Sequence, residues 1–341
     1  MTVLVTGGSG MVGSHVIAQL VARGTPVRAL VRPAARAAVE ALGATAVEGD
    51  VTDPAAWGRA ATDVQAIVHA AALVAPSAPL DAFLAVNVGG TRHALAVARA
   101  SGARLVHVSS VAVYGRTAGD GTGRASVDED FPFQRIWERD YYAQSKRQAE
   151  EVVWEEVARG GIGAVVIRPN VIYGEHDRLF SPRVVRAVRG GMVPQIGAGT
   201  NRLSCVYAGN VAAAILLALD ASRVSGRAFN TTDDGPDAFT QRGLVDAFAA
   251  ALGVRVRRVR MPYRVARFAV SAWARWQTLL RPGRYPGIGG SAVRFLAGEN
   301  PFVAERARRE LGWRPVLTPH EAVRRTVAWV DEVRANKNAR D

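Results

Sequence analysis

Short apolar runs alternate with amphipathic stretches of helical length over the first third of this 341-residue chain. The apolar runs are residues 3–5, 27–31, 46–47, 66–68 and 105–108, and the helical stretches are residues 11–22, a stretch from residue 34, and residues 89–100. Strands that alternate with helices form βαβ units, in which the strands run parallel and helices cover both faces of the sheet. We therefore predict an α/β protein built on a doubly wound parallel sheet.

The alternation continues through a helix over residues 142–159 and a strand over residues 164–169, and it loosens from about residue 180. Beyond that point we predict helices over residues 182–189, 209–219, 241–252 and 319–336, and short strands over residues 202–207 and 228–231. The chain is expected to divide into a first domain over residues 1–175 and a smaller, mixed α/β region over residues 176–341. Segments over about residues 203–232 are expected to return to the first domain.

The composition is that of a globular protein, since 49% of the residues are hydrophobic and 21% are charged. The single cysteine, Cys205, cannot form an intramolecular disulfide, so nothing ties the fold to an oxidising compartment. The apolar run that begins at Val3 leads directly into a glycine-rich turn and leaves no room for a secretory signal. We therefore expect a cytoplasmic protein.

Positive charge is concentrated at one end of the chain. The formal net charge is +13, and residues 253–341 hold 19 basic residues against 7 acidic ones. Within this region we predict a basic amphipathic helix over about residues 260–280. Its two faces consist of Arg260, Arg264, Arg267 and Arg275 on one side, and Val265, Phe268, Ala272, Trp276 and Leu279 on another.

Three settings fit such a helix. The interpretation that we favour is a helix packed on the core with solvated arginines, because surface helices ordinarily have this pattern. The alternatives are a cover over an apolar pocket and peripheral contact with an anionic membrane. Nucleic acid is not expected, since Glu305, Glu310 and Glu321 are interspersed with the arginines and no recognition motif is present.

The first apolar run ends in a glycine-rich turn that opens the first predicted helix. Glycines permit a tight turn and the close approach of a ligand, while the free N–H groups and the dipole of a helix N-terminus attract an anion. The strand, turn and helix together predict a pyrophosphate site of a dinucleotide. Its residues are Gly7, Gly10, Met11, Val12 and Gly13.

The spacing T-G-x-x-G-x-x-G resembles that of the extended short-chain dehydrogenases/reductases, the NAD(P)-dependent epimerase/dehydratase superfamily, which have a Rossmann-type domain. Further motifs of that family are N-V-x-G-T at residue 87, R-P-x-x-x-Y-G at residue 168 and A-x-x-x-L-G-[WY]-x-P at residue 307, so the resemblance covers nearly the whole chain. The resemblance implies that the region over residues 176–341 mainly binds the substrate. It assigns to the cofactor site Asp50 and Val51 at the adenine, Ala70, Ala71 and Ala72 beside the cofactor, Asn87, and Pro169 and Val171 at the nicotinamide.

The residue at the end of the second predicted strand indicates which dinucleotide is preferred. A carboxylate there binds the ribose 2′-hydroxyl of NAD, whereas an arginine accommodates the 2′-phosphate of NADP. Arg32 lies 19 residues after Gly13, and the next acidic residue is Glu40. We predict that NADP(H) is favoured over NAD(H), with Arg32 binding the phosphate and Arg36 in support. The alternative is a solvated surface arginine.

Three residues are predicted to be catalytic. Ser110 follows the fifth predicted strand, at the edge of a parallel sheet where ligands bind. Tyr142 and Lys146 are four residues apart and so share one face of a helix, where the ammonium can lower the pKa of the phenol. In the family, this Y-x-x-x-K tyrosine exchanges the substrate proton, the lysine also holds the nicotinamide ribose, and the serine binds the substrate oxygen. No metal ion is expected.

The segment over residues 201–211 resembles N-R-x-S-x-V-Y-x-x-N-V of the 3β-hydroxysteroid dehydrogenase-like group. That resemblance implies interconversion of a secondary alcohol and a ketone on a bulky apolar substrate, sterol-like or derived from a β-keto acyl chain. Leu203, Ser204 and Gly209 depart from the nucleotide-sugar epimerase pattern, and Val111 stands where a dehydratase has a carboxylate. A nucleotide-sugar epimerase or reductase with bound NAD(P), and a non-catalytic dinucleotide-binding sensor, remain the alternatives.

Loops over residues 74–79, 115–140 and 174–181, together with the C-terminal region, are expected to form the substrate pocket. A homodimer formed through two helices of the first domain is implied only by the resemblance.

Overall fold

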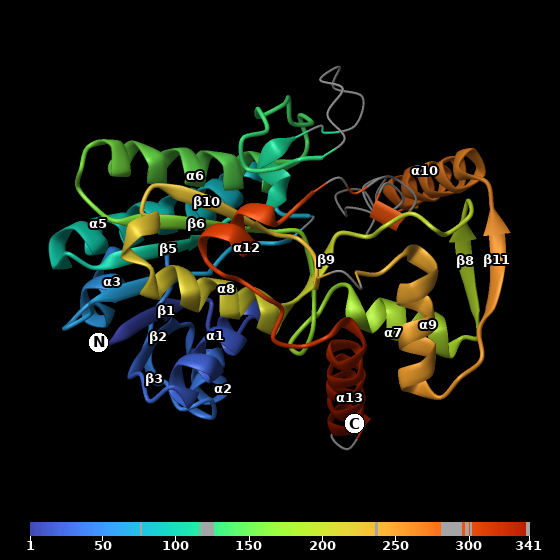
Figure 1. Ribbon diagram of the computed structural model, residues 1–341, viewed down its shortest axis with the longest axis horizontal. Coiled ribbons are helices and arrows are strands. Elements are labelled where there is room, and N and C mark those ends of the chain that lie inside the picture. Colours follow the sequence, from blue (N-terminus) through green and yellow to red (C-terminus); the bar gives the residue numbers. More distant parts are fainter. Residues whose placement is uncertain are drawn as a thin grey trace.

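The computed structural model describes residues 1–75, 77–115, 117, 126–235, 238–280, 295–296, 300 and 302–338. Figure 1 shows an α/β body around a central sheet, with a smaller group of helices and strands beyond one edge of that sheet. The sheet has seven strands in the order β10-β6-β5-β4-β1-β2-β3, and all its pairings are parallel. The predicted doubly wound parallel sheet is therefore confirmed.

The strands of this sheet are short and nearly continuously apolar, as expected where helices cover both faces. Their bounds are β1 Val3–Thr6, β2 Val27–Val31, β3 Thr45–Glu48, β4 Ala66–His69, β5 Arg104–Val108, β6 Ala164–Pro169 and β10 Arg227–Thr231. The strand order reverses between the neighbouring strands β1 and β4. The strands β2 and β3 follow on the side of β1, and β5, β6 and β10 follow on the side of β4. In open α/β sheets, ligands bind outside the carboxyl ends of the strands at such a reversal.

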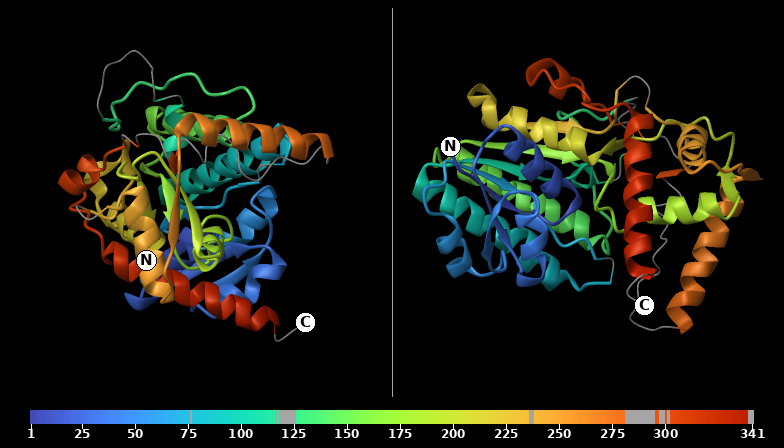
Figure 2. Two further views of the ribbon diagram at one scale, coloured as in Figure 1. Left: turned by 90° about the vertical axis from the view of Figure 1, so that its right-hand side faces the viewer. Right: turned by 90° about the horizontal axis from the view of Figure 1, so that it is seen from below.

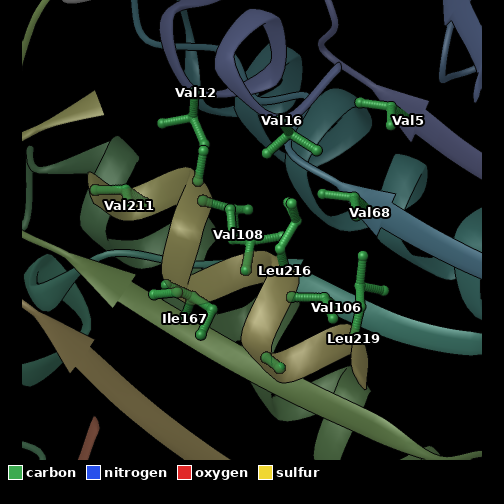
Figure 3. Close-up of a cluster of buried hydrophobic side chains, with 14 of the residues drawn as sticks. Val5, Val12, Val16, Val68, Val106, Val108, Ile167, Val211, Leu216 and Leu219 are labelled. Atoms are coloured by element: carbon green, nitrogen blue, oxygen red, sulfur yellow. The ribbon is translucent and has the colours of Figure 1, made fainter. Parts of the chain in front are cut away.

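Helices cover the two faces of the sheet. One face carries α1 (Met11–Ala22), α2 (Arg36–Glu40) and α8 (Ala208–Asp220), and the other carries α3 (Pro54–Ala60), α5 (Gly90–Ser101) and α6 (Tyr141–Ala158). Figure 3 shows the core of the first face, where Leu216 of α8 lies among Val16 of α1 and the strand residues Val106 and Val108. Residues 205–231 thus supply a strand and a covering helix to the body formed by the first 170 residues.

Shorter elements connect these helices and strands. They are the turns η1 Pro33–Ala35, η3 Val111–Tyr114 and η4 Ser222–Val224, the helix α4 Leu80–Phe83, and the π-helical stretch η2 Leu84–Gly89 that joins α4 to α5. The sequence did not predict η2 or α3, because neither has a clear apolar periodicity of its own.

The smaller region has its own apolar core, formed by residues of α7, α9 and α13 and by Tyr173, Leu203 and Tyr207. Its elements are β7 Val171–Tyr173 paired with β9 Cys205–Tyr207, α7 Ser181–Arg189, β8 Met192–Ile196 paired with β11 Arg257–Met261, α9 Gln241–Leu252, α10 Tyr263–Leu280 and α13 Pro319–Asn338. Both strand pairs are parallel. The pair β8 and β11 was not predicted, because Pro194 interrupts one strand and arginines dominate the other.

A late segment of the chain completes the core of the first domain. Ala304, Ala307, Leu311 and Trp313, which belong to or follow α12 (Glu305–Glu310), are buried in the same apolar cluster as α1 and α8. The indole of Trp313 also donates a hydrogen bond of 2.9 Å to the backbone oxygen of Asn210 in α8. Residues 304–313 therefore pack on the main body, although they lie far beyond residue 175 in the sequence.

The basic helix is shorter than predicted. Arg260 lies in β11, and the helix α10 begins only at Tyr263. Pro262 explains the difference, because proline favours an extended residue before it and is well tolerated at the start of a helix. The side chains of Arg267 and Leu279 lie outside the described residues. Among the helices of the described ranges, none combines the length and the apolar character that crossing a membrane requires.

Candidate active site

The glycine-rich turn lies at the carboxyl end of β1, directly against the segment that follows β4. Gly7 has a φ of +71°, and a Cβ atom there would lie 2.7 Å from the backbone nitrogen of Ala71. A Cβ atom on Gly13 would lie 2.2 Å from the carbonyl oxygen of Gly7. Any side chain at either position would therefore push the turn away from its neighbours. Gly10 is the N-cap of α1 and has no side chain to cap the helix, so these residues fit a pyrophosphate placed at its N-terminus.

A buried hydrogen-bond network fixes the segment beside this turn. The hydroxyl of Thr6 lies 2.8 Å from Nδ1 of His69 and accepts a hydrogen bond of 3.2 Å from the backbone N–H of Ala71. Burial lowers the pKa of His69 to about 3, with the ammonium of Lys146 contributing. His69 is therefore a neutral structural residue that positions Ala70, Ala71 and Ala72.

The residues assigned to the adenosine half lie at the carboxyl ends of β2 and β3. Asp50 accepts hydrogen bonds from the backbone N–H and the hydroxyl of Thr52. Asp50 is partly exposed. Arg32 is exposed and forms no ion pair with any described residue. Arg36, in contrast, binds the carboxylates of Glu40 and Glu48. Of the two arginines, Arg32 is thus the better placed to bind a phosphate.

Ser110 and Tyr142 are brought together at the carboxyl end of β5. Ser110 begins the turn η3, and its hydroxyl accepts a hydrogen bond of 3.2 Å from the backbone N–H of Ala112. Tyr142 lies in the first turn of α6, which Asp140 caps by accepting a hydrogen bond of 3.1 Å from Ala143. The hydroxyl of Ser110 lies close enough to that of Tyr142 to lower the pKa of the phenol. Two hydroxyls that meet in this way can hold a single substrate oxygen between them.

Lys146 lies one turn further along α6 and is 3% exposed. Its ammonium donates a hydrogen bond of 2.5 Å to the carbonyl oxygen of Val108, the last residue of β5. Burial lowers the pKa of Lys146 to about 8, and the nearby carboxylate of Glu150 opposes this effect. Lys146 therefore carries its charge at a cost, which is typical of a group that serves a site.

The pKa of Tyr142 differs from the expectation. It is raised from its ordinary value, because burial disfavours the phenolate and the carboxylate of Asp140 adds to this, although the nearby hydroxyl of Ser110 opposes it. The lowering that we expected from Lys146 is not found here. The physical reason is that the ammonium binds the carbonyl of Val108 rather than the phenol.

Asn87 connects the cofactor side of the site to α6. Its side-chain oxygen accepts a hydrogen bond of 2.7 Å from Leu73, and its amide donates one of 2.9 Å to Ser145. Ser145 in turn donates to the backbone oxygen of Tyr142 at 2.9 Å. The predicted residue Asn87 thus positions the first turn of α6 through Ser145, a residue that the sequence analysis did not single out.

A buried ion pair beneath the site was also missed. The Nε atom of Arg168 lies 3.1 and 3.2 Å from the two carboxylate oxygens of Glu150, and the side chains are 4% and 0% exposed. Glu150 also accepts a hydrogen bond of 2.7 Å from Ser109. Arg168 donates a hydrogen bond of 2.7 Å to the hydroxyl of Tyr114. These contacts join the ends of β5 and β6 to α6. Glu150 follows Lys146 by four residues, so helical spacing was the signal that could have revealed it.

A second missed group links the glycine-rich turn to the smaller region. Glu175, which follows the R-P-x-x-x-Y-G motif, lies 3.4 Å from Nε2 of His15 in α1 and accepts a hydrogen bond of 2.7 Å from the hydroxyl of Tyr207. Although burial opposes its ionisation, the nearby imidazole of His15 and the hydrogen bond from Tyr207 hold the pKa of Glu175 below its usual value. Pro169 is buried and Val171 half-buried where β6 leads into β7.

Comparison with known proteins identifies the family. The model of the NAD dependent epimerase/dehydratase family matches residues 3–231. The chain is 34% identical over 331 residues to the 4-hydroxy-2-methyl-3-oxo-4-farnesyl-3,4-dihydroquinoline-1-oxide ketoreductase of Stigmatella aurantiaca, with 95% of each chain covered. It is 30% identical to the 2-alkyl-3-oxoalkanoate reductase of Stenotrophomonas maltophilia, with 96% of this chain and 99% of the relative covered.

A 3 beta-hydroxysteroid dehydrogenase/Delta 5-->4-isomerase of Mycobacterium tuberculosis is 28% identical, with 99% of this chain and 94% of the relative covered. Among solved structures, a short-chain dehydrogenase/reductase superfamily protein from Agrobacterium tumefaciens with bound NAD superposes with a TM-score of 0.71 at 25% identity, covering 100% of both chains. Together with the family model, these relatives make the protein an NAD(P)-dependent short-chain dehydrogenase/reductase that acts on CH–OH groups. The resemblance read from the motifs is confirmed: the chain belongs to the NAD dependent epimerase/dehydratase family, the extended short-chain dehydrogenases/reductases.

Proposed function

We propose that the protein is an NADP(H)-dependent oxidoreductase that interconverts a ketone and a secondary alcohol on a bulky apolar substrate. The observation that carries this proposal is the meeting of the Ser110 and Tyr142 side chains at the end of β5, with the buried ammonium of Lys146 one helical turn away. The pair lies at the same edge of the sheet as the glycine-rich turn. The single cysteine, Cys205, is buried and free, so no intramolecular disulfide ties the fold to an oxidising compartment. We propose that the enzyme acts in the cytoplasm.

The residues divide the chemistry of reduction between them. When bound, the reduced nicotinamide supplies a hydride to the carbonyl carbon. Ser110 donates a hydrogen bond to the carbonyl oxygen, and Tyr142 gives its hydroxyl proton to that oxygen, so that an alcohol forms without a free alkoxide. Lys146 would hold the nicotinamide ribose. In the oxidative direction each of these transfers is reversed.

Two observations support an apolar substrate. Exposed apolar side chains occur on each of the three loops expected to form the substrate pocket: Val74, then Phe133 and Trp137, and Leu179. In addition, the relatives named for a farnesylated quinoline, a 2-alkyl-3-oxoalkanoate and a 3 beta-hydroxysteroid all have large apolar portions in their substrates. We infer that this chain takes a substrate of the same general class.

The proposal is tested by following cofactor absorbance at 340 nm over a panel of apolar ketones. Stoichiometric loss of NADPH with formation of a secondary alcohol is the expected result. A nucleotide-sugar epimerase would instead convert its substrate without net consumption of NADPH. A sensor would bind the dinucleotide and turn over none of the ketones.

Arg32 is expected to set the cofactor preference. Replacing it with serine removes the guanidinium that binds the 2′-phosphate, so the dissociation constant of NADPH should rise by roughly 10- to 100-fold, as for loss of a hydrogen bond to a charged group. The dissociation constant of NADH should change little. Fluorescence titration with both cofactors measures the effect. The matched control is Arg23→Ser, because Arg23 lies at the C-terminal end of α1, away from the glycine-rich turn. Tighter binding of NADH than of NADPH by the unmodified protein would contradict the assignment.

The lowered pKa of Lys146 predicts that both the free energy of unfolding and the affinity for the cofactor depend on pH. In the folded chain Lys146 loses its proton as the pH rises through about 8, whereas the unfolded chain retains it to its ordinary value of 10.5. The unfolded state therefore binds more protons between these two pH values, and this group makes unfolding less favourable as the pH rises through that window. His69 and His107 do not add charge there, since burial lowers both of their pKa values far below neutrality.

Cofactor affinity should follow the opposite trend, because the ribose requires the ammonium. The dissociation constant of NADPH is expected to be about tenfold higher at pH 9 than at pH 7, one pKa unit being a factor of ten in the charged fraction. Lys146→Met should bind more weakly and independently of pH over this range. A wild-type affinity that stays constant from pH 7 to pH 9 would exclude Lys146 as the titrating group.

A further inference from the structure

The helix α10 leaves its apolar stripe uncovered. One side of the helix packs on the smaller region, where Ala266 is buried against Ile196 of β8, with Met261 and Val270 beside them. The stripe on the other side remains in contact with solvent: Phe268 is 76% exposed, Val265 52% and Trp276 51%. Figures 1 and 2 show α10 at the end of the molecule farthest from the parallel sheet. Single exposed apolar residues are ordinary, but a row of them along one helix marks a contact surface.

Cationic residues border this stripe. At 100° per residue, Arg264 and Arg275 lie on the outward side of α10 next to Phe268. Both are exposed, and neither forms an ion pair with a described residue. The strand β11, which leads into the helix, also has the exposed residues Arg257 and Arg260, one on each of its faces. The sequence has no acidic residue between Asp246 and Glu299, so α10 itself has no negative charge to offset its arginines.

The two tryptophans of the helix fit a boundary between water and lipid. Trp273 and Trp276 lie in ring contact, with centroids 5.1 Å apart, and both are about half exposed. Tryptophan has an apolar body and one polar N–H group, which suits it to the headgroup level of a bilayer. A helix with an apolar face, interfacial tryptophans and a cationic border is the form that binds in the plane of an anionic membrane.

A second copy of the chain fits this surface less well. A two-fold interface brings the same patch of both subunits together, so Arg264 and Arg275 would face the same cationic patch of the other subunit. Without acidic residues on α10, such a contact would repel. We therefore propose that the exposed face of α10 docks the protein on an anionic lipid surface, where an apolar substrate would dissolve. The docking itself does not depend on the proposed reaction.

Partition into vesicles tests the docking without reference to activity. We expect the full chain to float with vesicles of phosphatidylcholine mixed with phosphatidylglycerol, to bind pure phosphatidylcholine vesicles more weakly, and to be released by high salt. The fluorescence of Trp273 and Trp276 should shift to the blue on binding. Absence of binding to the anionic vesicles at low salt would overturn the proposal.

Variants separate the two parts of the surface. Replacing both Arg264 and Arg275 with glutamine should lower the partition coefficient by roughly 25-fold, about fivefold for each basic residue near an anionic surface. Phe268→Ser should lower binding to anionic vesicles by about tenfold or more. The matched controls are Arg324→Gln with Arg325→Gln on α13 for the charge, and Val316→Ser for the apolar exposure, and neither should change partition.

Thermal unfolding of each variant confirms that the fold is retained, since all of the replaced side chains are exposed. Equal partition of the α10 variants and the controls would overturn the proposal. So would concentration-dependent dimerisation of the free protein that Phe268→Ser abolishes, because the face would then be covered by a second copy. Shielding of Trp273 and Trp276 from an aqueous quencher before vesicles are added would also contradict it.

Discussion

Replacing Tyr142 with phenylalanine is expected to lower kcat by about 10²–10⁴-fold, the usual contribution of a positioned acid–base group. The phenyl ring keeps the packing of the first turn of α6 but has no proton to give to the substrate oxygen. It also removes the hydroxyl that lies close to that of Ser110. The dissociation constant of NADPH should change by less than about threefold, because the ring is retained and Lys146 is untouched. Single-turnover absorbance at 340 nm and fluorescence titration measure the two quantities.

The neighbouring residue supplies the control for this experiment. Tyr141 lies in the same turn of α6 and is half-buried like Tyr142, but it has no lysine four residues later. Tyr141→Phe should therefore leave kcat within about twofold of the wild type, as surface changes away from the site usually do. Full activity of Tyr142→Phe would refute the assignment of the acid–base residue, and a loss shared equally by both variants would indicate a general disturbance of the helix start.

Replacing Glu150 with alanine is expected to lower the free energy of unfolding by about 3–5 kcal/mol, because the guanidinium of Arg168 would be left buried without its partner. Both side chains are almost fully inaccessible to solvent. The double variant Glu150→Gln with Arg168→Met should recover most of this loss, since it removes both charges together. Denaturant unfolding at pH 7 measures the stability of each variant.

A surface pair gives the matched comparison. Arg159 lies at the end of the same helix and pairs with Glu156 at 3.3 Å while largely exposed. Arg159→Ala should cost less than about 1 kcal/mol. If Glu150→Ala proved no more damaging than Arg159→Ala, the buried pair would not support the fold beneath the site. Glu150→Gln should also move the pKa of Lys146 further down, because the carboxylate favours its charged form.

The sequence predicted the α/β core well, because its strands are fully buried and its helices have a clear apolar periodicity. The predicted helix over residues 11–22 and the strands over residues 27–31 and 164–169 have the same bounds in the structure. The glycine-rich turn could be placed because only glycine fits at Gly7 and Gly13. The contact of Ser110 with Tyr142 follows from the topology of a parallel sheet and the start of a helix at its edge.

Features that depend on tertiary contacts were not predictable in the same way. The strand β11 has the composition of a solvated helix, and only its pairing with β8 makes it extended. The pKa of Tyr142 depends on which group the ammonium of Lys146 binds. The four-residue spacing of the two residues does not determine that partner. The packing of α10 on one side and its exposed stripe on the other likewise require knowledge of its neighbours. The roles of the individual site residues stay predictions until the variants are measured.

The burial of Trp313 in the core of the first domain has a consequence for how the protein is made. A ribosome delivers the glycine-rich turn, Ser110 and Lys146 early, but the apolar cluster that supports them lacks Ala304, Ala307, Leu311 and Trp313 until residues 304–313 have been synthesised. Domains that fold during synthesis usually do so from the N-terminus as each unit emerges. Here the cofactor-binding half would wait, with part of its apolar surface open, for a segment that follows the whole smaller region except α13 in the chain. Messages truncated upstream of that segment should yield chains that chaperones retain and proteases remove, even though every residue proposed for catalysis is present.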